Sequence, residues 1–503
     1  MVKNRRLRTD GLFDWQALYE GNRPLFRGQH PTKDLERNRK LVSDLGTYDL
    51  IALMCEELPA HLKSDYDFFK QRLVFPFVDV KSIRRTHEAI EELSSSPELN
   101  DAIALELENF DKAQKLLKFD QSNGNISLIE YLRKKIELYE PLGEVLDRAD
   151  SRVVRDIADI FQSSEGRNSP VKQLYDLVSS GAISFEGDLD GFEVKPEKVG
   201  GARTVNFTSD GSVSTHIISH SSQQRRSSSL LDGSLNFLKY CMTLANLAKK
   251  YGWVKPEFCA TGNTHIEGGY HPLLLMTVEL DKITCNDVDI DDSVRVVAVT
   301  GPNMAGKSTF IRNVGLISLL GQAGSYVPAT RATLPVYTDI RTYFGSQDNL
   351  LEKTSLFQKE MLEINRNLKD HKKGSLLICD ELFRGTEAGS DGGMLLHSAM
   401  VEALALDYTG RTILSSHYHD ALRSQQNVPR VKFLKTEVDE SGNPLYKVSE
   451  GIGIGGYSVR SALKAGIATP IARRLSGGIL PEGYREAKVI SDENLYSGDS
   501  SDE

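Results

Sequence analysis

The sequence predicts an α-helical core and lever domain with a small β-containing insert, followed by an α/β domain. Apolar residues recur at spacings of three and four over much of residues 41–180, which is the period of an amphipathic helix. From residue 264 onward, short β-branched runs alternate with helix-compatible segments, a pattern typical of a parallel sheet flanked by helices. Between these parts, strand-like runs around a turn signal predict the β-containing insert.

The composition is that of an ordinary globular protein. A chain of 503 residues is long enough for about three domains, and 40% hydrophobic residues provide for a buried core. No run approaches about 18 consecutive apolar residues, so we expect no membrane span, and the basic N-terminus lacks the apolar segment of a secretory signal. The five cysteines form no Cys-x-x-Cys pair, which favours a reducing compartment without a zinc site. A net charge of −9 gives no overall sign of nucleic-acid binding, so any DNA contact requires a local basic patch.

The N-terminal part is expected to change from irregular to helical near residue 40. Residues 1–40 are predicted to be an irregular basic arm, because prolines such as Pro24 and Pro31 interrupt any helical period. Residues 41–180 are predicted to form the helical core, since their apolar residues follow the helical period on both sides of an interruption at residues 72–79.

Residues 181–229 change in texture and are expected to form a short insert rich in β-structure and serine. The run 204–208 is typical of a strand, and Asp210-Gly211 after it is a strong hairpin signal. A Ser- and Gln-rich stretch with Arg225 and Arg226 ends the insert. This stretch is either a solvated loop or, through its two arginines, a loop that contacts the DNA backbone.

The second half of the chain is expected to begin with one long helix. Residues 230–263 should hold this lever helix and a linker, which starts where Trp253 and Pro256 end the helix. Residues 264–475 carry the alternating pattern of the α/β domain. Residues 476–503 are acidic and serine-rich, so we expect a disordered tail.

The most specific motif follows the apolar run 296–300. The next residues fit the phosphate-binding pattern Gly-x-x-x-x-Gly-Lys-Ser/Thr, with a strand before it and a helix after it. We expect Lys307 to reach the β- and γ-phosphates and Ser308 to ligate Mg²⁺. The alternative is a glycine-containing turn that binds nothing. The expected nucleotide contacts are Gly301, Pro302, Asn303, Met304, Ala305, Gly306, Lys307, Ser308 and Thr309.

Two further apolar runs end in polar residues that suit nucleotide hydrolysis. Residues 375–379 run into Asp380 and Glu381, which would support Mg²⁺ and deprotonate the attacking water, respectively, although both could simply end a strand. Residues 412–416 run into His417, which could sense the γ-phosphate or the water, or be structural. These features make the α/β domain a predicted P-loop ATPase domain of the ABC type, with Glu381, His417 and Lys307 as its catalytic candidates.

Ser355 precedes another predicted helix, which carries Phe357, Met361 and Ile364. Its simplest role is to cap this helix, with Gln358 as the partner in a capping box. The alternative is that the helix N-terminus faces an anion and completes the nucleotide site of a neighbouring subunit.

Together these motifs resemble the ATPase domain of the MutS family of DNA mismatch-repair and recombination proteins. The resemblance covers roughly residues 264–475 and is weaker upstream. A generic ABC ATPase with long coiled coils fits less well, because no segment sustains heptads. The motifs that carry the resemblance are Thr300–Thr309, Gly269–Pro272, Asn286-Asp287, Gly324–Pro328, Ser355–Met361, Asp380–Thr386, Ser416–Tyr418, Gly456–Ser458 and Ala465–Ile467.

The resemblance implies a role for each matching residue. Asn303, Lys307 and Ser308 would contact phosphates and Mg²⁺, and Asp380 would support the metal. Glu381 would act as general base, with His417 positioning the water. Ser355 would reach the ATP bound by the partner subunit, and Asn286 would lie in the segment that lines the adenine pocket.

Several positions depart from the family pattern. The aromatic residue that stacks on adenine falls at Ile283, so apolar packing would replace stacking. Asp391 is assigned to its family position only across a one-residue insertion. No Phe-x-Glu wedge precedes the helical core, so we expect a short family member that lacks the mismatch-binding domain and does not intercalate at a mismatch.

Two hypotheses follow. The first is a homodimeric or heterodimeric DNA clamp that binds and hydrolyses ATP with Mg²⁺, acting in repair or recombination on mismatched or branched DNA. The second is a nucleotide-gated scaffold that binds protein or ribonucleoprotein, which the acidic charge and the short insert favour. We expect the protein in the cytoplasm with the nucleoid if it is prokaryotic, and in the nucleus if it is eukaryotic.

Overall fold

The computed structural model describes residues 31–47, 49–50, 73, 76–77, 79–123, 125, 130, 134, 137–161, 203–207, 213–217, 230–345, 356–369, 371–383, 391–440, 442–453, 468–476 and 485. The chain packs into two compact units that interleave along the sequence. The first comprises Met1–Ile283, Asp287–Asp291 and Asn313–Arg341, and the second comprises Thr284–Asn286, Asp292–Arg312 and Thr342–Glu503. The domains expected from the sequence are continuous segments, whereas each of these units is built from three separate segments of the chain.

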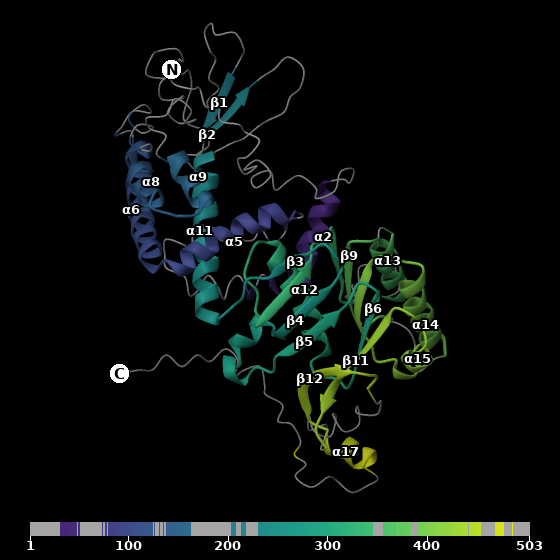
Figure 1. Ribbon diagram of the computed structural model, residues 1–503. Helices are drawn as coiled ribbons and strands as arrows, with labels where there is room; N and C mark the ends of the chain where they lie inside the picture. The colour runs from purple at the N-terminus through teal and green to yellow at the C-terminus, as the bar shows by residue number, and fades with distance from the viewer. Residues whose placement is uncertain are drawn as a thin grey trace. The chain divides into compact units, whose positions relative to one another are not determined.

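Helices dominate the described N-terminal part of the first unit (Figure 1). They are α2 (Pro31–Asp44), α5 (Val80–Ser95), α6 (Pro97–Ser122), α8 (Glu140–Leu146), α9 (Arg152–Phe161) and α11 (Leu230–Tyr251). The expectation of an irregular arm is wrong for residues 31–40, which lie in α2. Proline is well tolerated at the first position of a helix, where its missing N–H has no partner to lose, so Pro31 opens this helix.

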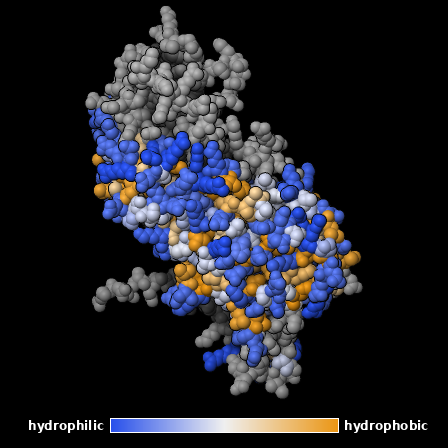
Figure 2. Space-filling view, viewed as in Figure 1, coloured by the Kyte–Doolittle hydropathy of each residue, from blue (hydrophilic) through white to orange (hydrophobic). Residues whose placement is uncertain are grey.

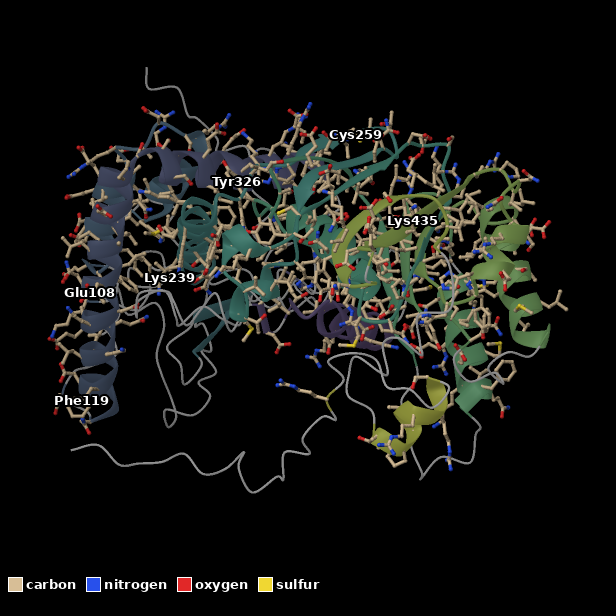
Figure 3. The ribbon with its side chains drawn as sticks, turned by 90° about the horizontal axis from the view of Figure 1, so that it is seen from below. Glu108, Phe119, Lys239, Cys259, Tyr326 and Lys435 are labelled. Carbon is tan, nitrogen blue, oxygen red and sulfur yellow. The ribbon has the colours of Figure 1, made fainter. Side chains whose placement is uncertain are left out.

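Helix α11 confirms the long helix expected at the start of residues 230–263, and its role as a lever remains a prediction. Every residue from Ser234 to Ala248 is buried or half-buried. The buried Lys239 ammonium lies 3.2 Å from Oδ1 of Asp111 on α6, and Figure 3 shows Lys239 between these two helices. Because an unpaired charge is strongly disfavoured in a core, this ion pair fixes how α11 sits against α6.

The first unit also contains a mixed four-stranded sheet of order β3-β7-β4-β5. Its strands are β3 (Glu257–Cys259), β4 (Thr264–Gly269), β5 (Asn286–Ile290) and β7 (Arg331–Pro335), with short 3-10 helices at Pro272–Met276 and Leu280–Lys282. Strand β4 pairs antiparallel with β7, so the parallel pairing expected after residue 264 does not extend to every strand of this sheet. Half-buried positions interrupt the buried ones along β4, as in a sheet with one partly solvated face.

A separate hairpin confirms the β-containing insert. Strands β1 (Arg203–Phe207) and β2 (Val213–Ile217) pair antiparallel, with Phe207 opposite Val213. This register brackets the Asp210-Gly211 turn signal. The turn itself, the serine-rich stretch and residues 162–202 lie outside the described residues.

A six-stranded sheet of order β12-β11-β6-β10-β9-β8 forms the centre of the second unit. Its strands are β6 (Val296–Thr300), β8 (Asp339–Tyr343), β9 (Ser375–Asp380), β10 (Arg411–Ser415), β11 (Val431–Val438) and β12 (Pro444–Glu450). Strands β11, β6, β10 and β9 run parallel, and β12 is antiparallel to β11. All positions of β6, β9 and β10 are buried, which explains their continuous apolar sequence.

Three helices cover one face of this sheet (Figure 1). They are α13 (Leu356–Leu368), α14 (Asp391–Leu406) and α15 (His419–Ser424). The described part of the chain after residue 264 also contains α12 (Lys307–Gln322) and α17 (Thr469–Leu475). The core contains Val296 and Ala298 of β6 together with Val401 of α14. Burying each of the two valine side chains contributes roughly 1.5–3 kcal/mol, which stabilises the central strands.

Helix α14 is apolar on both sides. Val401 and Leu404 are in the core, whereas Leu395 and Leu406 are 72% and 45% exposed. Apolar residues reach the surface in Figure 2 where Figure 1 draws α13 and α14. Among the described residues, no helix combines the length and apolar character needed to cross a bilayer.

Candidate functional site

The glycine-containing loop lies where β6 ends and α12 begins. Gly301 and Gly306 have φ angles of 141° and 92°, a region that side-chain-bearing residues rarely adopt. A Cβ atom on Gly301 would lie 1.9 Å from Oγ1 of Thr436, so glycine is required there. The loop turns directly into α12 at Lys307, and the free N–H groups at this helix start suit an anion.

Lys307 is folded over the same loop. Its side chain is buried, and Nζ donates to the carbonyl oxygens of Gly301 and Pro302 at 3.0 and 2.9 Å. Met304, at the tip of the loop, is 83% exposed with a φ of 61°. The loop therefore holds a cation close to the backbone N–H groups, as phosphate binding requires.

Asp380, at the end of β9, is bound to two hydroxyls. Ser308 Oγ and Ser415 Oγ donate to its Oδ1 at 2.8 and 2.6 Å, and Arg312 Nη2 lies 3.8 Å from its Oδ2. A serine hydroxyl beside a carboxylate is a pair of hard oxygen donors that suits Mg²⁺. No group of three or more His, Cys, Asp or Glu in the described part of the chain could hold a metal, so phosphate and water oxygens would have to complete its shell.

Glu381 points to a different partner from its neighbour Asp380. Its Oε1 lies 2.6 Å from Nε2 of His417, which follows β10. Its backbone N–H donates to Ser415 Oγ at 3.0 Å, and its φ is 57°. The two adjacent carboxylates are thus held by different groups, Asp380 toward the loop serine and Glu381 toward the imidazole.

His419 lies beside this pair at the start of α15. Burial is the largest cause that lowers its pKa, followed by the charges of His417, Lys307 and Arg423. Its Nδ1 has no hydrogen-bond partner. Among the described residues no contact connects His419 to Glu381 or Asp380, so we assign it no part in the site.

Asn286 is bound by strand β12. Its Nδ2 donates to the Tyr446 carbonyl at 2.9 Å, and its Oδ1 accepts from the Val448 N–H at 2.7 Å. Tyr446 is 52% exposed with a φ of 55°, and a Cβ on Gly306 would lie 3.4 Å from its ring. Asn286 therefore places an exposed aromatic side chain beside the loop. Ile283, the expected counterpart of the family aromatic, is buried.

Sequence reasoning missed Tyr446, Ser415, Arg312 and Glu360. Ser415 was within reach of prediction, because its position at the end of an apolar run mirrors that of Asp380, with which it pairs in the parallel register. Nothing in the local sequence marks Tyr446 or Arg312, and Glu360 lies within the motif Ser355–Met361, where no role was assigned to it. Arg225, Arg226 and Ser355 lie outside the described residues, and for Asp391, the first residue of α14, only the backbone is described.

Comparison with known proteins agrees with this geometry. Residues 297–477 match the family profile described as MutS domain V. The DNA mismatch repair protein MutS of Staphylococcus haemolyticus is 32% identical over 258 residues, which are 51% of this chain and 29% of that protein. The proteins of the same name from Staphylococcus epidermidis and Leuconostoc mesenteroides are 34% and 36% identical over 46% and 45% of this chain, and 27% of each relative. The matched part thus spans less than a third of these relatives, and residues 297–477 of this chain are similar to MutS domain V.

Proposed function

We propose that this protein binds ATP at the loop Gly301–Thr309 and hydrolyses it to ADP and phosphate. The observation that carries the proposal is the opposed binding of Asp380 and Glu381, with Oδ1 of Asp380 on Ser308 and Oε1 of Glu381 on His417. A hydrolase needs this separation, because one carboxylate must support the metal while the other accepts a proton from the attacking water.

The proposed roles follow from these contacts. Lys307 and the loop N–H groups bind the β- and γ-phosphates, and Asn303 and Thr309 lie in the same loop. Ser308 and Asp380 would hold Mg²⁺, which neutralises phosphate charge when bound. The oxygen of the attacking water bonds to the γ-phosphorus while the bond between the γ-phosphorus and the β-phosphate oxygen breaks. Glu381 accepts the proton that this water loses. His417 orients the Glu381 carboxylate through the 2.6 Å contact.

For the base of the nucleotide we propose Tyr446. Its ring is the exposed aromatic group beside Gly306, and Asn286 holds its backbone in place. A nucleobase gains roughly 1–3 kcal/mol by stacking on an aromatic ring. Tyr446 would then supply the stacking surface that Ile283 does not.

We further propose that the protein acts as a homodimer or heterodimer on mismatched or branched DNA in repair or recombination. The names of its relatives and the match to MutS domain V support this proposal. The test is ATP turnover in the presence of matched, mismatched and branched duplexes, with duplex affinity measured at increasing salt. We expect at least one duplex to stimulate turnover and affinity to fall steeply with salt, because phosphate contacts release counterions.

The competing function is a nucleotide-gated scaffold for protein or ribonucleoprotein, which the net charge of −9 favours. ATP turnover that no duplex changes, together with duplex binding that is absent or independent of salt, would reject the DNA role and favour the scaffold. A chain that binds no ATP would reject both.

A further inference from the structure

The turn that carries Glu381 has an unusual backbone. Glu381 and Phe383 have φ angles of 57° and 64°, in the left-handed region that residues other than glycine seldom adopt. Such a turn keeps its shape only where surrounding groups hold it. The position of the Glu381 carboxylate therefore depends on what binds Phe383.

Both backbone polar groups of Phe383 are bound by side chains from other elements. Its N–H donates to Oε1 of Glu360 at 2.6 Å, and its carbonyl accepts from the Tyr418 hydroxyl at 3.2 Å. Tyr418 directly follows His417, the partner of Glu381. The turn is thus held on one side by α13 and on the other by the end of β10.

Glu360 is a buried carboxylate in the middle of α13, only 2% exposed. Its Oε1 also accepts from the Tyr343 hydroxyl of β8 at 2.8 Å. Hydrogen bonds to an ionised carboxylate are short and strong, so this oxygen ties α13 and β8 to the turn. Helix α13 begins at Leu356, immediately after Ser355.

The ring of Phe383 is packed as firmly as its backbone. Its centroid lies 6.4 Å from that of His397, which in turn lies 5.1 Å from that of Tyr418. His397 is fully buried and comes from α14. Because both ring and backbone are constrained, a shift of α13 cannot be absorbed by Phe383 alone and must reach Glu381.

We propose that Glu360 is a positioning residue for ATP hydrolysis. Through Phe383 it sets the position of the Glu381 carboxylate and couples α13 to the proposed site of proton transfer. This inference rests on the proposed ATPase function. In this proposal Glu360 acts through Phe383 and has no direct part in the proton transfer.

The test compares three substitutions at one position in the full-length chain. Glu360→Gln keeps an acceptor oxygen for the Phe383 N–H, Glu360→Asp keeps the charge but withdraws it by one methylene, and Glu360→Ala removes the acceptor. Turnover is measured at saturating ATP with Mg²⁺, and affinity by titration with a fluorescent ATP analogue. We expect kcat to fall about 10- to 100-fold in Glu360→Ala and about tenfold in Glu360→Asp, because small displacements of a reacting group slow catalysis strongly.

Glu360→Gln should remain within about threefold of the wild-type kcat, and all three variants should bind the analogue with unchanged affinity. Tyr343→Phe is the matched control, since it removes the other donor to the same oxygen and leaves the Phe383 bond in place. Its kcat should stay within about twofold of wild type.

A purely structural role predicts a different pattern, in which kcat falls in proportion to the melting temperature and Gln gives no rescue. That pattern, or an unchanged kcat in Glu360→Asp, overturns the inference. Glu360→Asp retains the buried charge, so the comparison with Gln stands even if Glu360→Ala does not fold. A wild-type chain that hydrolyses no ATP would instead reject the proposed function, and the inference with it.

Discussion

His417 and Glu381 lie at the ends of two adjacent parallel strands, and their side chains meet with Nε2 of His417 2.6 Å from Oε1 of Glu381. The pairing of β10 with β9 places Ser415 opposite Asp380, so the residues that follow emerge at the same edge of the sheet. An imidazole that donates to a carboxylate fixes its orientation without taking its negative charge. The 2.6 Å contact therefore gives the Glu381 carboxylate a defined direction, which its proposed role as general base requires.

The first prediction concerns Glu381 itself. Glu381→Gln should bind ATP normally and hydrolyse it at least about tenfold more slowly, because an amide cannot accept the proton of the attacking water. Single-turnover hydrolysis and analogue binding would be measured on the same preparation. Glu402→Gln, an exposed change on α14, should leave both quantities unchanged. Equal turnover in Glu381→Gln and wild type would remove Glu381 from the role of base.

The second prediction tests whether the site is shared between subunits. Lys307→Ala and Ser355→Ala should each hydrolyse ATP poorly. If Ser355 completes the partner's site, a mixture of the two variants contains dimers with one intact site, and turnover should partly recover. A mixture that stays as inactive as its components would mean that Ser355 acts within its own subunit. Mixing either variant with itself provides the baseline.

The parts of the site that could be predicted are those whose functional residues lie within one short segment of the sequence or directly after a predicted strand. The loop Gly301–Thr309 is continuous, and its spacing alone predicts a strand, a tight turn and a helix, which the structure contains. Asp380 and His417 end apolar runs, and buried parallel strands present their carboxyl ends at one edge of a sheet. Their position at one edge could therefore be expected, whereas their contact depends on β9 and β10 being neighbours in the sheet.

The parts that could not be predicted depend on contacts between distant segments. Glu360 looks like an ordinary polar residue of an amphipathic helix, and its hydrogen bonds with Tyr343 and with Phe383, 23 residues later, explain its burial. Tyr446 lies 160 residues from Asn286, which binds its backbone. The error over Pro31 has a different origin, because the same residue that breaks a helix interior favours a helix start.

The third prediction tests the proposed stacking residue. Tyr446→Ala should weaken ATP binding about tenfold or more, since the loss of base stacking removes roughly 1–3 kcal/mol, while Tyr446→Phe should bind as wild type. The neighbouring Leu445 is a similarly exposed apolar residue of β12, 46% exposed, so Leu445→Ala is the matched control. Affinity for GTP should fall similarly, because stacking does not distinguish the bases. An affinity in Tyr446→Ala equal to that of the control would exclude the ring from the nucleotide site.

The fourth prediction concerns stability in acid and rests on two buried histidines. Burial is the main cause that lowers the pKa of His87 to about 4, aided by the Lys255 charge and opposed by a Ser325 backbone hydrogen bond and by Glu91. Burial likewise lowers the pKa of His397 to about 4. Nε2 of His87 and both ring nitrogens of His397 have no hydrogen-bond partner, so neither ring offers a favourable place for a second proton.

Both rings are neutral in the folded and unfolded chain above about pH 6.5, where they do not affect stability. Below that pH the unfolded chain takes up protons that the folded chain refuses, so the free energy of unfolding falls until about pH 4. Each histidine should then remove about 2 kcal/mol between roughly pH 7 and pH 5.

Denaturant unfolding of wild type and His397→Phe at these two pH values would measure the difference. His397→Phe should lose less stability on acidification than wild type. The control is His265→Gln, at an exposed histidine whose pKa is raised chiefly by its hydrogen bond to Glu267. This control should lose at least as much stability in acid as wild type. An equal acid loss in wild type and His397→Phe would show that protonation of His397 does not limit stability.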